Sequence, residues 1–587
     1  MESHIGEFLK ELSLKPEADK LEVREYQINI ARSILGKGNS LVIMPTALGK
    51  TFVSVFVMAK LVREMREGKR ERKKFLFLAP TKPLAAQQAK RLHELIDFGP
   101  WEKEKLIEGE SRLGKEKEGS SGMVLEGKES AIELEQEDRS TPAKKKEEEK
   151  ISEVMLLTGE MAPGKRELLW KKGEVWCYAA TPQTVEFDVL AGRVRLEDFA
   201  LIVFDEAHRA VKEYSYSFVA REAGKRGIFL IGLTASPSSR REVIDEICMN
   251  LGVRNIEIRD ELDFDVRKYA HQIKMDWVFV GLPAELRELR DSLQEMLREV
   301  LEELKRMGVL GTIDYRAHKR ELLMLRQRAI SALQTDPINY QVLSLHARAM
   351  NLSHAIDLVE IDGVHSLLQF MKDMETRERQ SKAVKLLLND PRWLGVQLKC
   401  LNLVEQGMEH PKFSKLREIM GEEMREGKKI IVFAHFRNTV KRIVEELGKM
   451  GGLKPVGFIG KSNEGMGQKQ QQHVMQQFRE GEYNVLVATS VGEEGLDIPE
   501  VELVVFFEAV PSEIRLIQRR GRTGRVKEGK AIILVTKGSK DETFFWSSRR
   551  KEKKMREVVE GIRREGLVGV EEQNEYHSGN QSRIFDY

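Results

Sequence analysis

Two adjacent carboxylates, Asp205 and Glu206, end an apolar run that begins at Leu201. Such a run is typical of a buried parallel strand, which delivers its last side chains to the carboxyl edge of an open sheet, where these sheets bind ligands. Paired acids at that edge suit nucleotide hydrolysis, because Asp205 can hold Mg²⁺ while Glu206 polarises an attacking water. The alternative is a solvated strand end. A hydrolytic site would need a phosphate cradle elsewhere in the chain.

Residues 41–51 supply a candidate cradle: a second apolar strand, a tight turn and the start of a helix. Backbone N–H groups of the turn would surround the phosphates, Lys50 would reach the β and γ oxygens, and Thr51 would bind the metal. Gly-Lys-Thr alone is common, but together with the acids it predicts an ATPase. The residues expected to bind the nucleotide are Thr46, Ala47, Leu48, Gly49, Lys50 and Thr51, with Gln27 as a candidate reader of the adenine edge.

Further strands of the same type end in hydroxyl groups. Thr81 and Lys82 follow the strand at 74–79, and Thr181 ends the strand that begins at residue 174. Both loops suit contacts with a nucleic-acid backbone, and plain strand-to-helix turns are the alternative. Thr234 and Ser236 follow another strand and could link the acids to a nucleic-acid groove. Repeated strands with helical patterns between them predict a doubly wound parallel sheet from about residue 20 to 245.

Composition limits the class of protein. A chain of 587 residues exceeds one hydrophobic core and must form several domains. Charged residues make up 33% of the chain but the net charge is only +3, so a nucleic-acid surface must be a local basic stripe. The three cysteines lack metal-ligand spacing, and no stretch of about eighteen apolar residues predicts a membrane span. We expect a soluble, cytoplasmic, nucleoid-associated protein.

The domain organisation follows from changes in pattern along the chain. The predicted divisions are a first α/β domain at 1–245, a linker and helical domain at 246–410, a second α/β domain at 411–545, and a basic, helical and flexible tail at 546–587. Lys/Glu blocks without aromatic residues predict a disordered insertion at about 102–150. Within the helical domain, Lys319 and Arg320 could clamp a duplex, and a solvated helix face is the alternative.

The stretch from Gln518 to Arg525 is the most specific sequence motif in the second predicted α/β domain. Two glycines bring the backbone close to a partner, and the arginines around them suit bidentate pairing with phosphate oxygens. A disordered Arg-Gly tail is the alternative. A helical pattern precedes the stretch and an apolar strand follows it, which predicts that it lies within a fold.

The chain resembles superfamily 2 helicases over about residues 20–540, because it contains similar motifs in the same order. These are Gln27, the phosphate loop, Asp-Glu-Ala-His, Thr-Ala-Ser, Gly-Leu-Asp and Gln-Arg-Arg-Gly-Arg-Thr-Gly-Arg. The helical insertion resembles that of the branch containing archaeal Hef, FANCM, Dicer and the RIG-like sensors. Residues 277–283 and 545–550 resemble archaeal Hef most closely. The resemblance implies two RecA-like parallel-sheet domains with an all-helical domain between them.

The same resemblance implies a DNA-stimulated ATPase and helicase that uses ATP and Mg²⁺. It would act on forked or branched DNA in replication-fork repair and move 3′ to 5′. By motif match, Arg522 and Arg525 act as arginine fingers, Gln518 senses the γ-phosphate or its water, and Asp497 approaches the ribose. The expected DNA contacts are Thr81, Lys82, Thr181, His435 and Thr489, and the residues expected to couple them to hydrolysis are His208, Thr234 and Ser236.

Two departures from the family pattern leave alternatives open. Ala47 stands where the family usually has Gly, and at positive φ its methyl group would cost about 1 kcal/mol or more. A DNA-binding scaffold with a weakened ATPase is therefore one alternative, and a double-stranded RNA translocase of the Dicer or RIG-like kind is another. Hef continues into a nuclease domain that this sequence lacks, so the helicase part either stands alone or is truncated. A sliding clamp or a nuclease is the expected protein partner, and the oligomeric state stays open.

Overall fold

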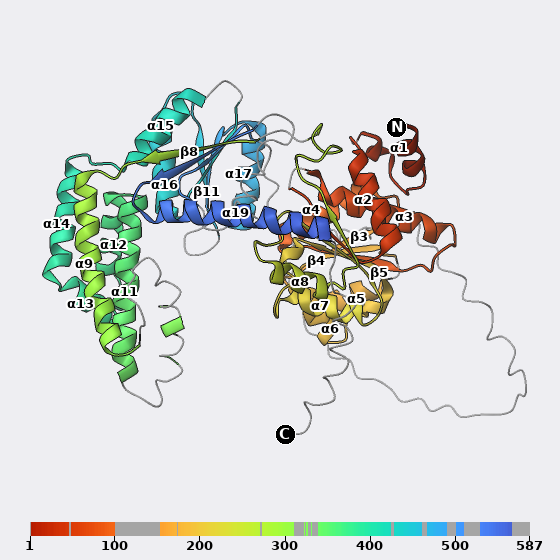
Figure 1. Cartoon of the computed structure of the whole chain (residues 1–587), viewed down its shortest axis with the longest axis horizontal. Coiled ribbons are helices and arrows are strands. Elements are labelled where there is room, and N and C mark those ends of the chain that lie inside the picture. Colours follow the sequence, from red (N-terminus) through yellow and green to blue (C-terminus); the bar gives the residue numbers. More distant parts are fainter. Residues whose placement is uncertain are drawn as a thin grey trace, which may run out of the picture.

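A computed structural model shows two parallel-sheet domains, a helical domain and a long C-terminal helix (Figure 1). The structure describes residues 2–20, 22–45, 48–99, 153–172, 174–269, 273–309, 322, 324–326, 330, 338–423, 428–460, 466–489, 501–509 and 529–565. The insertion predicted at 102–150 lies outside these residues.

The first domain is built on a seven-stranded sheet with the order β3-β4-β2-β5-β6-β1-β7, in which the described pairings are parallel. Its strands are β1 (Ser40–Ile43), β2 (Lys74–Leu78), β3 (Val154–Leu157), β4 (Cys177–Ala180), β5 (Phe199–Asp205), β6 (Phe229–Thr234) and β7 (Asn255–Ile258). Val42 packs into one hydrophobic core, whereas its neighbours Leu41 and Ile43 pack into another. Both faces of the sheet are therefore buried, which explains the continuous apolar runs.

Helices cover both faces of this sheet. They are α1 (Glu2–Lys10), α2 (Glu25–Lys37), α3 (Lys50–Arg66), α4 (Lys82–Leu95), α5 (Pro163–Lys171), α6 (Pro182–Leu190), α7 (Ser215–Gly224) and α8 (Arg241–Asn250). The first four contribute to the core that contains Val42, and the last four contribute to the core on the opposite face. The predicted doubly wound architecture is confirmed.

The second domain has a six-stranded sheet with the order β10-β11-β9-β12-β13-β8, again with parallel pairings among the described strands. Its elements are β8 (Ile273–Val280), α15 (Pro411–Glu423), β9 (Ile430–Phe433), α16 (Arg437–Gly448), β10 (Pro455–Phe458), α17 (Gln468–Glu480), β11 (Val485–Ala488), β12 (Leu503–Phe506) and β13 (Gly529–Thr536). Ile431 and Phe433 pack on one face and Ile430 and Val432 on the other, as in the first sheet.

The helical domain lies between the two sheets in the chain. Its helices are α9 (Ala284–Arg306), α11 (Ile338–Ile361), α12 (Val364–Glu375), α13 (Lys382–Leu388) and α14 (Pro391–Glu405). Buried residues of α9 recur at spacings of three and four, including Leu286, Leu289 and Leu293, and they share a core with Trp393 of α14. The predicted helical domain between two sheets is therefore confirmed.

Strand pairing divides the chain differently from the boundary expected at residue 245. β7 follows that boundary but pairs with β1 of the first sheet. β8 precedes the helical domain but pairs with β13 of the second sheet along its whole length, from Ile273 opposite Gly529 to Val280 opposite Thr536. The helical domain is thus inserted between the edge strand of the second sheet and the rest of that sheet.

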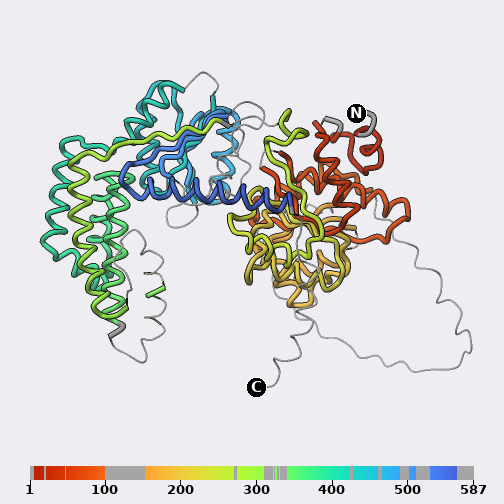
Figure 2. The backbone as a smooth tube through the Cα atoms, viewed as in Figure 1, coloured from red at the N-terminus to blue at the C-terminus, as the bar shows by residue number. Residues whose placement is uncertain are grey.

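Helix α19 (Lys540–Glu565) runs from the second domain back to the first, as the ribbon and the backbone tube both show (Figures 1 and 2). Its early residue Phe545 belongs to a core of the second domain. Its late residue Ile562 belongs to a core of the first domain. None of the helices that the structure describes is long and apolar enough to cross a membrane.

Candidate active site

The described part of the phosphate loop lies between β1 and α3, where Gly49 precedes the first helical residue, Lys50. Gly49 has φ 73° and ψ 43°, a left-handed conformation that residues with a Cβ rarely adopt. A Cβ at this position would lie 2.6 Å from Nε2 of Gln27 and 3.0 Å from Cδ2 of Phe52. The backbone angles therefore favour glycine, and any residue with a Cβ would also force the Gln27 amide to move.

Lys50 links this loop to the predicted acids. Its Nζ is buried and donates a hydrogen bond to the carbonyl oxygen of Met44 at 3.1 Å. Its charge favours the ionised forms of both Asp205 and Glu206. Thr51 follows in the first turn of α3. The structure therefore brings the lysine of one motif close to the acids of the other.

Gln27 lies beside the same loop and is 3% exposed. Its Nε2 donates to the carbonyl oxygen of Leu48 at 3.1 Å, and its Oε1 accepts a hydrogen bond from the backbone N–H of Arg24 at 3.2 Å. An amide group offers two N–H donors and two lone pairs, so one of each is left for a base edge. A cavity of about 190 Å³ opens here and is lined by Glu22, Val23, Arg24, Gln27, Gly49, Phe52 and Phe56.

Asp205 is the last residue of β5, and Glu206 follows it with φ 54° and ψ 49°, a left-handed conformation unusual for a residue other than glycine. Oδ1 of Asp205 accepts a hydrogen bond from the backbone N–H of Glu206 at 3.1 Å. Burial, followed by the charge of Glu206, raises the pKa of Asp205 to about 7. Burial also opposes ionisation of Glu206, but the neighbouring His208, Lys50 and Arg209 together hold the pKa of Glu206 below its ordinary value.

The three residues expected to couple hydrolysis to nucleic-acid binding lie together. Nδ1 of His208 is 3.3 Å from Oε2 of Glu206 and 3.2 Å from Oγ1 of Thr234. Oγ1 of Thr234 also accepts a hydrogen bond from the backbone N–H of Ser236 at 3.3 Å. His208 therefore connects the acid after β5 with the loop after β6.

Two residues near Asp205 were missed by the sequence reasoning. Gln88 of α4 is buried, and its Nε2 donates to Oδ2 of Asp205 at 3.4 Å. The hydroxyl of Tyr216 donates to the backbone carbonyl of Asp205 at 2.7 Å. A signal for Gln88 existed, because it occupies the apolar stripe of α4 that Ala85 and Leu92 also form. A polar residue at a core-facing position indicates a specific partner.

The residues present fit a magnesium nucleotide. Among the described residues, no group of three or more His, Cys, Asp or Glu side chains could hold a metal ion. Mg²⁺ does not need such a group, because it keeps several waters and shares one or two protein oxygens with substrate phosphates. Asp205 and the hydroxyl of Thr51 are the donors of the expected kind. Oε1 of Gln88, which is buried without a hydrogen-bond partner in the described structure, could accept from a metal-bound water. Bound Mg²⁺ would neutralise phosphate charge at this edge.

The predicted nucleic-acid loops of the first domain lie side by side. Thr81 is the N-cap residue of α4 after β2, and Thr181 is the N-cap residue of α6 after β4, each without a side-chain capping hydrogen bond. The two strands are paired, with Leu78 opposite Ala180. Oγ1 of Thr181 lies 2.8 Å from Oγ1 of Thr184. Lys82 forms an ion pair with Glu160, which compensates part of the positive charge that the sequence suggested for this loop.

The predicted nucleic-acid contacts of the second domain also follow neighbouring strands of its sheet. His435 follows β9 and Thr489 follows β11, and these strands are neighbours with Phe433 opposite Ala488. The backbone N–H of His435 donates to Oε1 of the buried Glu508 at 2.9 Å. Both residues therefore lie at the carboxyl edge of the second sheet.

The other predicted site residues cannot be placed. Thr46, Ala47, Lys319, Arg320, Asp497, Gln518, Arg522 and Arg525 lie outside the described residues. Their assignment rests on the sequence motifs, and their roles stay predictions.

Comparisons with known proteins agree with this architecture. Residues 20–239 match the model for the Type III restriction enzyme res subunit, residues 285–407 match a helical-bundle model of ATP-dependent RNA helicases, and residues 411–527 match the helicase conserved C-terminal domain. The solved structure of the Pyrococcus furiosus Hef helicase domain is 38% identical in sequence, covers 91% of this chain and 99% of its own, and superposes with a TM-score of 0.62.

Curated relatives extend the similarity. A Methanocaldococcus jannaschii protein described as an ATP-dependent RNA helicase is 33% identical over 94% of this chain. The Arabidopsis thaliana DEAD-box ATP-dependent RNA helicase FANCM is 31% identical over 90%, and the Neurospora crassa ATP-dependent DNA helicase mph1 is 30% identical over 92%. The chain spans 63%, 36% and 43% of the lengths of these three relatives, respectively.

Two parallel sheets with a phosphate loop and an acid pair on the first, and a helicase C-terminal domain in the second, define an ATP-dependent helicase, which is a hydrolase. The inserted helical domain and the match to nearly the whole Hef helicase domain narrow the class further. The chain belongs to the Hef/FANCM branch of the superfamily 2 helicases.

Proposed function

We propose that this protein is an ATP-driven DNA helicase or translocase that acts on forked or branched DNA in replication-fork repair and moves 3′ to 5′. The observation that carries the proposal is that one sheet edge holds both halves of the expected machinery. Lys50 follows β1, Asp205 ends β5 and Glu206 follows it, while the threonine loops follow β2 and β4 of the same sheet. A change at the nucleotide can therefore reach the nucleic-acid loops through neighbouring strands.

In the proposed chemistry, Lys50 compensates phosphate charge and Thr51 and Asp205 supply oxygen donors for Mg²⁺. Glu206 is the base that orients and activates the attacking water, because its neighbours favour its ionised form. His208 lies between Glu206 and Thr234, which supports its proposed role in coupling hydrolysis to movement. Arg522 and Arg525 would complete the site from the second domain when the two sheets approach each other.

Support for DNA as the substrate comes from the relatives. The similar structure is the helicase domain of Hef, and mph1 of Neurospora crassa is named as a DNA helicase. Two other relatives are named as RNA helicases, which favours a double-stranded RNA translocase as the second candidate function. A sliding clamp or a nuclease stays the predicted protein partner.

The test is ATP hydrolysis at saturating single-stranded DNA, duplex DNA, forked DNA, a four-way junction and duplex RNA, with Glu206→Gln as the inactive control. We expect forked DNA to stimulate the highest rate. Maximal stimulation by duplex RNA would replace this proposal with the RNA translocase. Binding of DNA without any stimulated turnover would favour a scaffold with a degenerate ATPase.

A further inference from the structure

Helix α19 is attached to all three domains. Lys540 forms an ion pair with Asp357 of the helical domain, and the ring of Phe545 lies 4.5 Å from that of Trp277 on β8. At the other end, Arg563 donates to both carboxylate oxygens of Asp263 in the first domain at 2.9 and 2.8 Å. The middle of the helix therefore spans the space between two anchored ends.

The outward face of this middle segment combines one aromatic residue with several positive charges. Arg550 lies four residues after Trp546, and Lys553 and Lys554 lie three and four residues after Arg550, which places these side chains on one side of a helix. Phe545, Ser548 and Met555 form the buried side. Trp546 is 53% exposed, and the side chain of Lys553 is 81% exposed. A large aromatic ring is therefore held in solvent beside cations.

The charge on this face is poorly compensated. Residues 549–556 contain six basic residues and one acid, Glu552, which pairs with Arg556 at 2.9 Å. Lys553 reaches Glu557 only at 3.9 Å. Arg550 and Lys554 form no ion pair with any acid in the described parts of the chain, and Arg550 uses Nε to donate to the backbone carbonyl of Trp546. Most of the N–H groups of both side chains remain for a partner.

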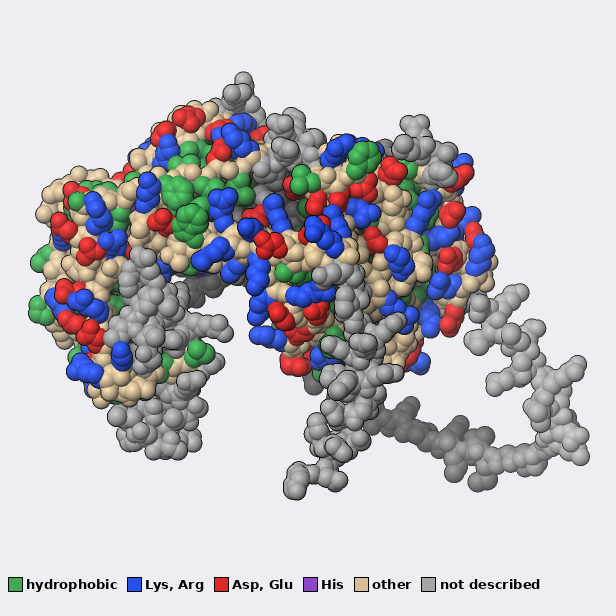
Figure 3. Space-filling view, viewed as in Figure 1, with side chains coloured by type: hydrophobic (Ala, Val, Ile, Leu, Met, Phe, Trp, Pro, Cys, Tyr) green, Lys and Arg blue, Asp and Glu red, His purple; other side chains and the backbone are tan. Residues whose placement is uncertain are grey.

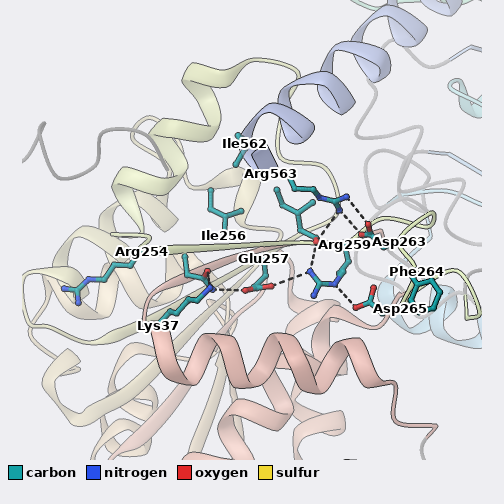
Figure 4. A pocket seen from close by; sticks show the side chains of 12 residues that line it. Lys37, Arg254, Ile256, Glu257, Arg259, Asp263, Phe264, Asp265, Ile562 and Arg563 are labelled. Carbon is teal, nitrogen blue, oxygen red and sulfur yellow. Dashed lines mark hydrogen bonds and ion pairs between the residues drawn. The ribbon is translucent and has the colours of Figure 1, made fainter. Parts of the chain in front are cut away.

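Another charged surface of the described structure differs in its ion pairing. This surface is the cavity along β7, which has a volume of about 720 Å³ and is also lined by arginines (Figure 4). There, Arg259 pairs with Asp265 and Arg563 pairs with Asp263, so two of the arginines are compensated by acids that also line the cavity. In contrast, Lys and Arg side chains gather over α19 where it runs between the second and the first domain, next to a hollow in the surface (Figure 3).

We propose that this outward face of α19 binds the phosphate backbone of a single-stranded arm of forked DNA, with Trp546 stacking on a base. A basic stripe that carries an exposed aromatic ring is the usual surface for single strands, because cations follow the phosphates while the ring stacks on any base. The stripe from Trp546 to Lys554 is about 12 Å long, at about 1.5 Å per residue, so it would contact only a short stretch of a strand. The inference rests on the proposed function, since it assumes a DNA substrate.

A membrane surface fits this helix less well. An interfacial helix binds a bilayer by burying its apolar stripe among the lipids. The apolar stripe of α19 is already used, because Phe545 packs against the second domain while Met555 and Ile562 pack against the first. The exposed face offers Trp546 as a single large apolar side chain among cations.

The test is the charge reversal Arg550→Glu/Lys554→Glu, with binding measured by fluorescence anisotropy without nucleotide. We expect the affinity for a fork with single-stranded arms to fall about tenfold or more, and the slope of log affinity against log salt to decrease by about 1.4, at about 0.7 for each lost phosphate contact. Affinity for a blunt duplex and the melting temperature should stay near those of the parent. Trp546→Ala should weaken fork binding about fivefold or more, and Trp546→Phe should retain most of it.

The matched control is Lys171→Glu/Lys225→Glu, which makes the same change in net charge at two exposed lysines of the first domain. Its fork affinity should stay within about twofold of the parent. The proposal is overturned if the two double variants bind the fork equally well, if the blunt duplex loses as much affinity as the fork, or if Arg550→Glu/Lys554→Glu abolishes only binding to phosphatidylserine vesicles. DNA-stimulated ATP hydrolysis by the parent distinguishes failure of the proposed function from failure of this inference. If DNA does not stimulate hydrolysis by the parent, the proposed function fails. If stimulation is normal and the variant binds the fork as tightly as the parent, this inference alone is refuted.

Discussion

Substitution of Gly49 by Ala tests whether the loop geometry supports nucleotide binding. Gly49 lies in the left-handed region, and an added Cβ would meet the Gln27 amide at 2.6 Å. The left-handed backbone would cost about 1 kcal/mol or more for a residue with a Cβ. Gln27 would have to move and release the carbonyl of Leu48, which costs about 1 kcal/mol more for a lost hydrogen bond. The lost hydrogen bond costs no more than this, because the carbonyl of Leu48 still accepts a hydrogen bond from the hydroxyl of Tyr26, at 2.8 Å.

The expected loss of stability for Gly49→Ala is therefore about 2 to 3 kcal/mol, or roughly 4 to 12 °C in the melting temperature of a domain of this size. Two other glycines of the first domain separate the contributions. Gly227 has φ +66° and open space around its Cβ position, so Gly227→Ala should show backbone strain alone, about 1 kcal/mol. Gly164 lies in α5 with open space, and Gly164→Ala should be neutral or stabilising by about 0.5 to 1 kcal/mol.

Thermal melting of the three variants is measured beside their affinity for a nonhydrolysable ATP analogue. Gly49→Ala should lose nucleotide affinity because Gln27 no longer faces the cavity in the same way, whereas Gly227→Ala and Gly164→Ala should bind normally. If Gly49→Ala melts like Gly227→Ala and binds nucleotide as well as the parent, the contact between the loop and Gln27 does not support the site.

Three further predictions address catalysis and stability. Lys50→Ala should abolish ATP hydrolysis and change DNA affinity by no more than about twofold, since the lysine compensates nucleotide charge away from the nucleic-acid loops. Phosphate release measures hydrolysis, and fluorescence anisotropy measures DNA affinity. Near-normal hydrolysis would contradict the phosphate-loop assignment. Arg522→Ala and Arg525→Ala should each bind ATP but hydrolyse it about 10³ to 10⁵ times more slowly in a single turnover, and a loss of only a few-fold would show that these arginines are not fingers. Burial, with the charge of Asp357, raises the pKa of Glu360 to about 7 from its ordinary 4.5, so the unfolded chain ionises first and stability falls as the pH rises between these values. Glu360→Gln should therefore melt higher than the parent at pH 8 and nearly equally at pH 5, and equal melting at both would show that Glu360 adds no pH-dependent cost.

The sequence predicted those parts of the fold and site that depend on local patterns. Apolar runs ending in Asp205 or in hydroxyls identified the strands, since a strand buried on both faces must be apolar throughout. The place of β8 in the second sheet could not be predicted, because parallel pairing joins residues more than two hundred positions apart and leaves no local signal. Gln88 was missed because a glutamine in a helix usually faces solvent. The ion pair between Lys82 and Glu160 was missed because it depends on how two loops meet.

The proposed helicase activity is measured by ATP-dependent displacement of a labelled strand from forked DNA, comparing forks that offer only a 3′ or only a 5′ single-stranded arm. We expect the parent to displace the strand when the 3′ arm is present, Lys50→Ala and Glu206→Gln to leave it paired, and a duplex RNA of equal length not to be separated. Equal displacement by Glu206→Gln, or separation of the RNA duplex in preference to the DNA fork, would contradict the proposed activity.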